Sequence, residues 1–353
     1  PSSSTLAWLA TRDLEYLDLG AQLIDSRTGR AENGTMSSLM QTPSFVCLRG
    51  AISYGFYAPL SCPSSPLTKN DQLYVYVTED YSCWMEKLFR EYPESLNHAF
   101  HQFALPGAHD AGTFSLQTVK KLTLDCSFAL HAVKNLAVTQ KDDITTMLNL
   151  GIRYFDFRPG TLVPPLGWFC PNVRFHQHAF IPGYPYISFL EDILTWLAGH
   201  PSEIVVVNAN TQGFLCSSMR PRPEDLDADL AFAFSKTGLT HEIRVGGKES
   251  LSQSLQRLLD LNTRLIFLNQ IADHPETTKY DSYSDQDYAT LTPDPIIKAL
   301  KRMTKVKQAK ADYTVLQMQG TATEVSGVVL PSLLTRSEAS SPLMSTKASF
   351  DAA

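Results

Sequence analysis

The sequence has no apolar run that approaches the ~18 residues a membrane-spanning helix needs. Any contact with a membrane is therefore expected to be made from the water side. Its six cysteines are widely spaced and include no Cys-x-x-Cys pair, so neither a zinc knuckle nor a dithiol redox centre is indicated. Lys and Arg are outnumbered by Asp and Glu, 30 to 36, which gives a net charge of −6. This is not the charge pattern of a nucleic-acid-binding protein, and no nucleic-acid partner is expected.

One stretch of the chain is basic, and it comprises Lys301, Arg302, Lys305, Lys307 and Lys310. Its simplest interpretation is the solvated end of a helix, with a weak contact to anionic lipid headgroups as the alternative. With 353 residues, 43% of them hydrophobic, the chain is long enough for a large α/β domain of about 250 residues and a smaller second domain.

Residues 1–97 contain short alternating runs separated by turn residues. Aromatic residues and valine recur with a period of two at 14–19, 44–49, 52–57 and 72–77, which predicts antiparallel strands. We therefore predict a small all-β, sandwich-like domain over residues 1–97. A glycosylation sequon, Asn33-Gly34-Thr35, falls at an expected exposed turn. The sequon permits secretion without indicating it, and the compartment is left open.

A helical pattern over 84–101 is expected to link this domain to a second one over 98–353, in which strands and helices alternate. Strands are expected at 102–106, 152–157, 173–176, 204–208, 264–268 and 313–318, and helices at 142–150, 187–198, 223–237, 251–261 and 293–303. The run 204–207 is apolar on both faces, as in a parallel sheet covered on both sides. The expected fold is α/β, a distorted (β/α) TIM-type barrel that is either complete or lacks its last strand.

Ionisable and amide side chains gather where the expected strands end, and the carboxyl ends of barrel strands are where active sites form. They are His109 and Asp110 after the first strand, Asp156 and Arg158 at the second, His176 and His178 at the third, and Asn208 and Asn210 at the fourth. One histidine can remove a proton from an attacking hydroxyl and another can protonate a leaving oxygen, while an arginine presents a fork of donors to a phosphate. The set therefore predicts phosphoryl transfer.

Four motifs in this order carry a resemblance to a known family. They are Leu-Pro-Gly-Ala-His-Asp-Ala-Gly-Thr-Phe at 105–114, Leu-Gly-Ile-Arg-Tyr-Phe-Asp-Phe-Arg at 150–158, Phe-His at 175–176 and His-Pro-Ser-Glu-Ile-Val-Val-Val at 200–207. The region from about 98 to about 325 resembles the catalytic X domain of phosphatidylinositol-specific phospholipase C. It is more similar to the bacterial, metal-independent branch and to X-domain-containing eukaryotic relatives. The resemblance implies a distorted TIM barrel that cleaves a phosphodiester by attack of the substrate's own neighbouring hydroxyl, giving a cyclic inositol phosphate and diacylglycerol.

Position in the motifs implies a role for each residue. His109 resembles the general base, Asp110 the carboxylate that assists the general acid, and His176 the general acid. Arg158 resembles the phosphate-binding arginine and Asp156 its acidic companion. In calcium-dependent relatives an acidic ligand aligns with Arg158, so a guanidinium takes the electrostatic role of calcium, and no metal or other cofactor is expected. The residues expected to bind substrate are Asp156, His178, Asn208 and Asn210. The expected partner is a phospholipid at a membrane surface, and the oligomeric state is left open.

Three departures from the family pattern bear on these roles. The third motif continues as His-Gln-His instead of His-Gly, so His178 is a rival to His176 for the role of general acid. The fourth strand has Asn210 where the bacterial branch has a lysine in its substrate pocket. The family's base is oriented by an aspartate on the last strand, and Asp351 has no strand pattern before it.

Two other functions stay open on the sequence. One is a catalytically inactive lipid-headgroup binding module with the same barrel, which Gln177, Asn210 and the unfound last-strand aspartate favour. The other is a metal-dependent glycerophosphodiesterase or sphingomyelinase D-like barrel. That function would need a Glu-x-Asp metal pair where this chain has Asp156-Phe157-Arg158.

Overall fold

The structure is a computed structural model of the whole chain. It describes residues 20–25, 31–35, 73–77, 81–122, 137–140, 142–239, 242–271, 277–281, 298, 301 and 311–315. At 20–25, 31–35, 73–77, 120–122 and 281 it describes the backbone alone.

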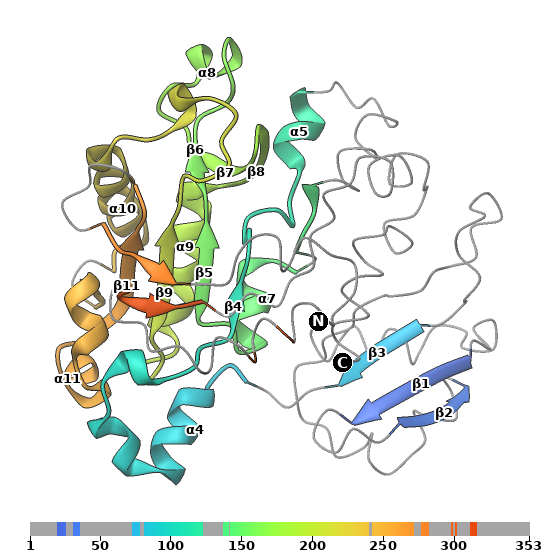
Figure 1. Cartoon of the computed structure of the whole chain (residues 1–353), viewed down its shortest axis with the longest axis vertical. Helices are drawn as coiled ribbons and strands as arrows, with labels where there is room; N and C mark the ends of the chain where they lie inside the picture. The colour runs from blue at the N-terminus through green and yellow to red at the C-terminus, as the bar shows by residue number, and fades with distance from the viewer. Residues whose placement is uncertain are drawn as a thin grey trace.

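The centre of the fold is a five-stranded parallel sheet covered by helices (Figure 1). Its strands lie in the order β10 (Arg244–Gly246), β11 (Thr263–Asn269), β9 (Val205–Ala209), β5 (Tyr154–Phe157) and β4 (Gly107–Ala108), and each neighbouring pair is parallel. The predicted α/β fold with a parallel sheet is therefore confirmed. Within the described ranges this sheet ends at β10 and β4, so closure into a barrel stays a prediction.

The sheet is buried on both faces because its strands carry apolar side chains on both sides. The covering helices are α4 (Trp84–Glu91), α7 (Ile144–Asn149), α9 (Tyr186–Ala198), α10 (Pro223–Thr237) and α11 (Leu255–Asp260). In β9, Val205 and Val207 belong to a core cluster with residues of α7, α9 and α10. Ile204 and Val206 belong to a second cluster with residues of α4 and α11. Alternate residues of one strand thus join two cores, which fixes the register of the sheet.

The helices predicted over 142–150, 187–198 and 223–237 are confirmed as α7, α9 and α10. The pattern over 84–101 is broken at Pro93, which lacks an amide hydrogen and therefore begins a helix instead of continuing one. The chain continues there as two 3-10 helices, η2 (Pro93–Asn97) and η3 (Phe100–Gln102). Met85 and Phe89 of α4 lie in the second core cluster. The division of the chain at residue 97 stays a prediction.

Three strands of the sheet lie where they were expected: those predicted over 152–157, 204–208 and 264–268 are confirmed as β5, β9 and β11. The strand predicted over 102–106 lies later, as β4, because pairing with β5 starts only at Pro106. The Pro106 carbonyl accepts hydrogen bonds from the amides of Arg153 and Tyr154, at 2.9 and 3.1 Å. The helix predicted over 251–261 is instead a 3-10 helix, η5 (Lys248–Ser252), followed by α11.

Shorter elements complete the described part of the chain. They are α5 (Gln117–Leu122), α8 (Leu166–Phe169), the 3-10 helix η4 (Ser217–Met219), and β12 (Tyr280–Asp281) paired in parallel with β13 (Tyr313–Thr314). The strand predicted over 313–318 begins as β13, and its end lies outside the described residues. In the helix predicted over 293–303, Lys298 and Lys301 are described, and both are helical. No helix of the described residues has the length and apolar character to span a membrane.

The expectation that residues 173–176 form the third parallel strand is wrong. β7 (Phe175–His178) lies in a separate antiparallel sheet between β6 (Pro159–Gly160) and β8 (Ile181–Pro185). The chain reverses directly after β7 at Ala179, whose φ is 60°, instead of crossing over through a helix. β5 therefore pairs with β9, and pairing of Pro159 with His176 places β7 beside the end of β5.

The amino-terminal segments form a mixed sheet in the order β2 (Ala31–Thr35), β1 (Gly20–Asp25), β3 (Leu73–Val77). The strand predicted over 72–77 is present as β3, but it pairs with β1 in parallel, not antiparallel. Asn33 lies in β2 opposite Gln22, so the turn predicted there is wrong. The strands predicted at 14–19, 44–49 and 52–57 lie outside the described residues. The all-β domain as a whole stays a prediction.

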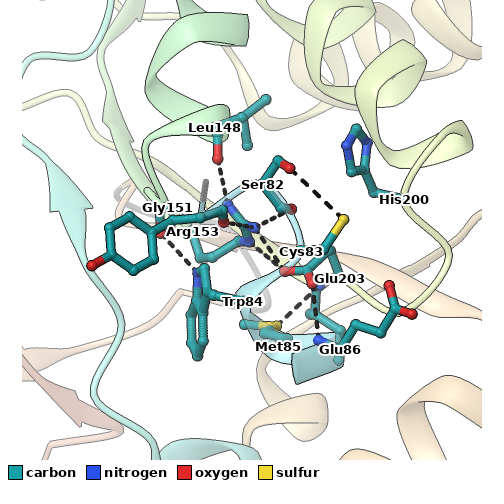
Figure 2. A network of polar contacts seen from close by, with 12 residues as sticks. Ser82, Cys83, Trp84, Met85, Glu86, Leu148, Gly151, Arg153, His200 and Glu203 are labelled. Atoms are coloured by element: carbon teal, nitrogen blue, oxygen red, sulfur yellow. Dashed lines mark hydrogen bonds and ion pairs between the residues drawn. The ribbon is translucent and has the colours of Figure 1, made fainter. Parts of the chain in front are cut away.

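A buried ion pair joins β5 to the start of β9 and to the segment before α4 (Figure 2). The Arg153 guanidinium donates to Glu203 Oε2 from Nε at 2.9 Å and from Nη2 at 2.7 Å, and both side chains are almost fully buried. Its remaining donors reach the carbonyls of Tyr81, Ser82, Leu148 and Ile152. The guanidinium carbon also lies 4.6 Å from the ring centre of Trp196. Arg153 thus connects segments that are far apart in the sequence.

We expect Glu203→Ala to lower the free energy of unfolding by about 3–5 kcal/mol, because it leaves the buried Arg153 cation without its counter-ion. Urea denaturation followed by circular dichroism measures the change. Glu224→Ala is the matched control, since Glu224 pairs with Arg222 and both side chains are exposed. The control is expected to change stability by less than about 1 kcal/mol. Equal losses in the two variants would contradict the anchoring role of the buried pair.

Candidate active site

The loop after β4 turns sharply and delivers two ionisable side chains to the edge of the sheet. Asp110 adopts a left-handed conformation, with φ of 50°, which Asp tolerates better than most residues. Its carbonyl accepts hydrogen bonds from the amide of Thr113 at 3.0 Å and from the Thr113 hydroxyl at 2.9 Å. The amide of Ala111 donates to the carbonyl of Asp156 at 2.9 Å, which ties the turn to the end of β5.

Thr139 and Gln140 support this turn, a role that no pattern in the sequence indicates. The Gln140 side chain donates to the carbonyl of His109 at 2.7 Å. The amides of Thr139 and Gln140 donate to the Thr113 hydroxyl oxygen at 3.1 and 3.2 Å. No spacing rule links these residues to the turn, because they lie 26 to 31 residues further along the chain than their partners.

The structure brings the predicted catalytic residues together around the carboxylate of Asp110, whose side chain is 2% exposed. The distances to its oxygens are 3.1 Å from His109 Nε2, 2.9 Å from Arg158 Nε, 3.4 Å from His176 Nε2 and 3.8 Å from His178 Nε2. Asp156 lies beside this group, with Oδ2 3.2 Å from His109 Nδ1 and 3.6 Å from Arg158 Nη2. Two carboxylates thus lie among an arginine and three imidazoles.

The charges of this cluster shift the pKa values of its members in opposite directions. Burial opposes ionisation of Asp110, but His109 and Arg158 outweigh it and hold the pKa of this carboxyl well below its usual range. Burial likewise opposes the charged form of His109, but Asp110 and Asp156 outweigh it and raise the pKa of His109 to about 10. In the free protein His109 is therefore an imidazolium at neutral pH.

His176 is fully buried on β7, and its contacts determine which ring nitrogen carries the proton. The backbone amide of Arg158 donates to His176 Nδ1 at 3.2 Å, so in the neutral ring the proton lies on Nε2, which faces Asp110. Burial lowers the pKa of His176, which keeps the ring neutral. A Cβ atom on Gly112 would lie 2.4 Å from the Cβ of His176, so a glycine at this position of the motif allows the close approach.

Gln177 and His178 follow on the same strand and differ in their environments. Gln177 is buried, and its amide nitrogen donates to the carbonyls of Gly160 and Thr161 at 3.1 Å each, so the departure from the His-Gly motif joins β7 to β6. The His178 side chain is 33% exposed at the open side of the cluster. Burial lowers the pKa of His178 as well.

The two asparagines expected to bind substrate already have protein partners. Asn208 Oδ1 accepts a hydrogen bond from the Tyr313 hydroxyl at 3.3 Å. Asn210 Oδ1 accepts from the amide of Gln212 at 2.9 Å, and its Nδ2 is 3.5 Å from Asp156 Oδ1. Their assignment to substrate binding stays a prediction, and the visible role of both side chains is to connect the ends of neighbouring elements.

Three of the residues could in principle share a metal ion. His109, Asp110 and Asp156 each offer a ligand atom, and these atoms lie within 4.8 Å of one another. The Arg158 guanidinium contacts both carboxylates, at 2.9 and 3.6 Å, and supplies the positive charge that they need. Calcium takes about 6–8 oxygen ligands, far more than two carboxylates already paired with an arginine can offer. Among the described residues, this group therefore offers fewer oxygen ligands than a calcium site takes.

Comparisons with known proteins confirm the family resemblance that the motifs predict, to the X domain of phosphatidylinositol-specific phospholipase C. The mouse PI-PLC X domain-containing protein 1 is 27% identical over 154 residues, which cover 39% of this chain and 41% of the relative. The human protein of the same name is 26% identical over 140 residues, 35% of this chain and 40% of the relative. The match therefore spans about two fifths of the length of each relative.

Solved structures with a similar arrangement come from bacteria. A mutant of the phosphatidylinositol-specific phospholipase C of Staphylococcus aureus is 18% identical, covers 69% of this chain and 79% of that chain, and has a TM-score of 0.45. The phosphatidylinositol-specific phospholipase C of Listeria monocytogenes is 14% identical, covers 69% and 80%, and has a TM-score of 0.43. No protein-family model matches the chain.

Proposed function

We propose that this protein is a phosphoric diester hydrolase of the phospholipase C type that cleaves a phosphoinositide or related glycolipid. One observation carries the proposal. Arg158 Nε and His176 Nε2 are buried donors without a regular hydrogen bond among the described residues, and both face the same carboxylate oxygen, Asp110 Oδ1. Each donor lies near this carboxylate without a well-aligned hydrogen bond to it, so a ligand can take it over, and phosphate oxygens are acceptors of the right charge. The relatives' names supply the class of lipid.

The proposed reaction needs a base, an acid and a group that stabilises the phosphate charge. His109, as a neutral ring, takes the proton from a hydroxyl of the substrate, and that oxygen bonds to phosphorus. The bond to the diacylglycerol oxygen breaks, and His176 returns a proton to that oxygen. It does so as the imidazolium, which the phosphate charge and Asp110 favour in the substrate complex, so His109 gains the proton that His176 loses. Arg158 stabilises the charge on the phosphate oxygens. The products are a cyclic inositol phosphate and diacylglycerol, and the steps consume no net proton.

His178 remains the rival general acid, because it is partly exposed and next to the same carboxylate. His176 is fully buried, so it reaches a leaving oxygen only if that oxygen enters the space beside Asp110. His176→Gln and His178→Gln separate the two roles, since loss of the general acid lowers kcat far more for a poor leaving group than for an activated one.

α8 lies at the same end of the molecule as the antiparallel sheet (Figure 1), and its Leu166, Trp168 and Phe169 side chains are exposed. We define the rim patch as Leu166, Trp168, Phe169, Val173, Phe180 and Leu215. Trp168 and Phe169 of α8 are 73% and 80% exposed. The amide of Leu215 donates to the carbonyl of Ala179 at 3.4 Å, so the loop of Leu215 lies against the turn that follows His178. Such a patch beside the site supports a substrate presented at a lipid surface.

We expect the double variant Trp168→Ala, Phe169→Ala to weaken binding to phosphatidylinositol-containing vesicles by at least about tenfold, because each large side chain contributes about 1.5–3 kcal/mol when it leaves water. Vesicle co-sedimentation measures the affinity, and turnover of a short-chain soluble substrate is expected to stay unchanged. Phe232→Ala is the control, since Phe232 is an exposed aromatic residue on α10, 57% exposed and outside the rim patch. Equal effects of the two variants would argue against a lipid-contacting patch.

Release of water-soluble inositol phosphate from phosphatidylinositol vesicles, measured with EDTA present, tests the proposed function. Turnover in EDTA that His109→Ala and His176→Ala abolish is the expected result. Strict dependence on calcium would overturn the metal-independent reaction. The binding-module alternative predicts that vesicles bind without turnover and that binding survives both histidine substitutions.

A further inference from the structure

We propose that Asp156 is the positioning residue of His109, the function that the family resemblance gives to an aspartate on the last strand. This inference rests on the proposed function. It concerns the arrangement of the base, and it has a readout that does not require turnover.

A histidine that takes a proton on one ring nitrogen needs the other nitrogen protonated and held by an acceptor. In this structure Asp156 Oδ2 lies 3.2 Å from His109 Nδ1. The other ring nitrogen, Nε2, faces Asp110 at 3.1 Å, and the His109 side chain is 36% exposed. Each ring nitrogen thus meets a nearly buried carboxylate. Asp110 is shared with Arg158 and His176, so its contact with Nε2 is the one that we assign to replacement by a hydroxyl of the substrate, while Asp156 keeps the proton on Nδ1.

The Asp156 carboxylate is held more firmly than an exposed loop carboxylate would be. Asp156 lies in β5, between β9 and β4 of the parallel sheet, in register with Asn208 of β9. Its backbone carbonyl accepts the amide of Ala111, and Asn210 Nδ2 is 3.5 Å from its second oxygen. The same element therefore orients the carboxylate and ties down the turn that carries His109.

The surrounding charges keep Asp156 ionised. Arg158 Nη2 is 3.6 Å from Asp156 Oδ2 and His109 is the other cation beside it, and together they outweigh burial and lower the pKa of the carboxyl. Asp110 is the opposing carboxylate near the ring. His178, which also borders Asp110, is neutral because burial lowers its pKa. An ionised Asp156 acts as an acceptor for the Nδ1 proton and cannot donate in its place.

Nitrogen-15 chemical shifts of the imidazole rings, recorded against pH in the full chain, test this arrangement directly. The His109 signals are assigned by their loss in His109→Gln. Wild type is expected to keep a proton on Nδ1 after the ring loses its charge. In Asp156→Asn the carboxamide can donate to Nδ1, so the neutral ring is expected to carry its proton on Nε2 and the pKa to fall.

Activity supplies the second readout and the matched control. Asp156→Asn is expected to lower kcat by about 10²–10⁴-fold while KM changes little, because the base is present in the wrong tautomer. Asp351→Asn tests the carboxylate nearest the end of the chain, and it is expected to leave both the tautomer and kcat unchanged. An unchanged His109 tautomer and pKa in Asp156→Asn, or a loss of kcat in Asp351→Asn, would overturn the proposal. If wild type turns over no phosphoinositide, the proposed function fails, while the chemical shifts still decide the role of Asp156.

Discussion

Replacement of Arg158 by alanine is expected to lower kcat by at least about 10³-fold, the scale on which an arginine that stabilises a transferring phosphoryl group acts in other enzymes. Arg158 Nε is buried, lacks a regular hydrogen bond, and lies 2.9 Å from Asp110, so an incoming phosphate would take over this donor. Initial rates on phosphatidylinositol vesicles in EDTA measure the effect. A loss of less than tenfold would contradict the role of Arg158 in stabilising the phosphate.

A second substitution distinguishes the charge of Arg158 from its shape. Arg158→Lys keeps the positive charge but presents one ammonium group in place of a planar fork, so we expect it to recover only part of the activity. Arg222→Ala is the control for removal of an arginine. Arg222 is 71% exposed and pairs with Glu224 and Asp225, not with Asp110 or Asp156. Thermal unfolding is measured in parallel, because Arg158→Ala also leaves two buried carboxylates with fewer cations. Full activity in Arg158→Lys would show that charge alone suffices.

The sequence predicts which of these residues come together in space, because most of them follow strands directly. His109 and Asp110 come after β4, and Asp156 and Arg158 lie at the end of β5. In a parallel sheet these ends meet at one edge, so residues 47 and 48 positions apart in the chain, His109 with Asp156 and Asp110 with Arg158, are brought into contact. Local pattern and sheet geometry together determine this part of the site.

The position of His176 could not be predicted in the same way. Its apolar-polar pattern is the same in a parallel strand and in a hairpin, because both place alternate residues on opposite faces. The difference lies in the turn at Ala179, whose positive φ is unusual for alanine and has no sequence signature. The histidine nevertheless reaches the site, because pairing of β6 with β7 brings it alongside Arg158.

The side-chain contact between Asp156 and His109 also could not be predicted from the sequence. The resemblance assigns Asp156 to the arginine, and Arg158 does contact it at 3.6 Å. The shorter contact, to His109 Nδ1 at 3.2 Å, forms where the chain turns at Asp110, whose φ is 50°. Backbone conformations of single residues decide such contacts, and spacing in the sequence does not report them.

The pH dependence of catalysis is expected to be steep. Since Asp110 and Asp156 raise the pKa of His109 to about 10, the neutral ring that acts as base is scarce at pH 7. kcat/KM reports the free enzyme, so on a substrate with an activated leaving group, which needs no proton from His176, we expect it to rise about tenfold per pH unit between pH 7 and 9. Initial rates under first-order conditions measure this. A flat profile over that range would mean that His109 is not the base, or that it is already neutral in the free enzyme.

The contribution of His109 to stability is expected to fall as pH rises, whereas kcat/KM rises. Both changes follow from deprotonation of His109. The pKa of His109 is higher in the folded than in the unfolded chain, so its contribution to stability is complete below about pH 6.5, the unfolded value, and is lost as pH rises through about 10. Urea denaturation of wild type and His109→Gln at several pH values isolates this contribution, since other groups titrate alike in both proteins. The difference in free energy of unfolding between them should therefore shrink from pH 7 to 10, over the window in which kcat/KM of wild type increases. If this difference in free energy of unfolding stays constant with pH, the protonated ring of His109 is not paired with Asp110 and Asp156. Loss of that ion pair on deprotonation is what would change stability and kcat/KM over the same pH range.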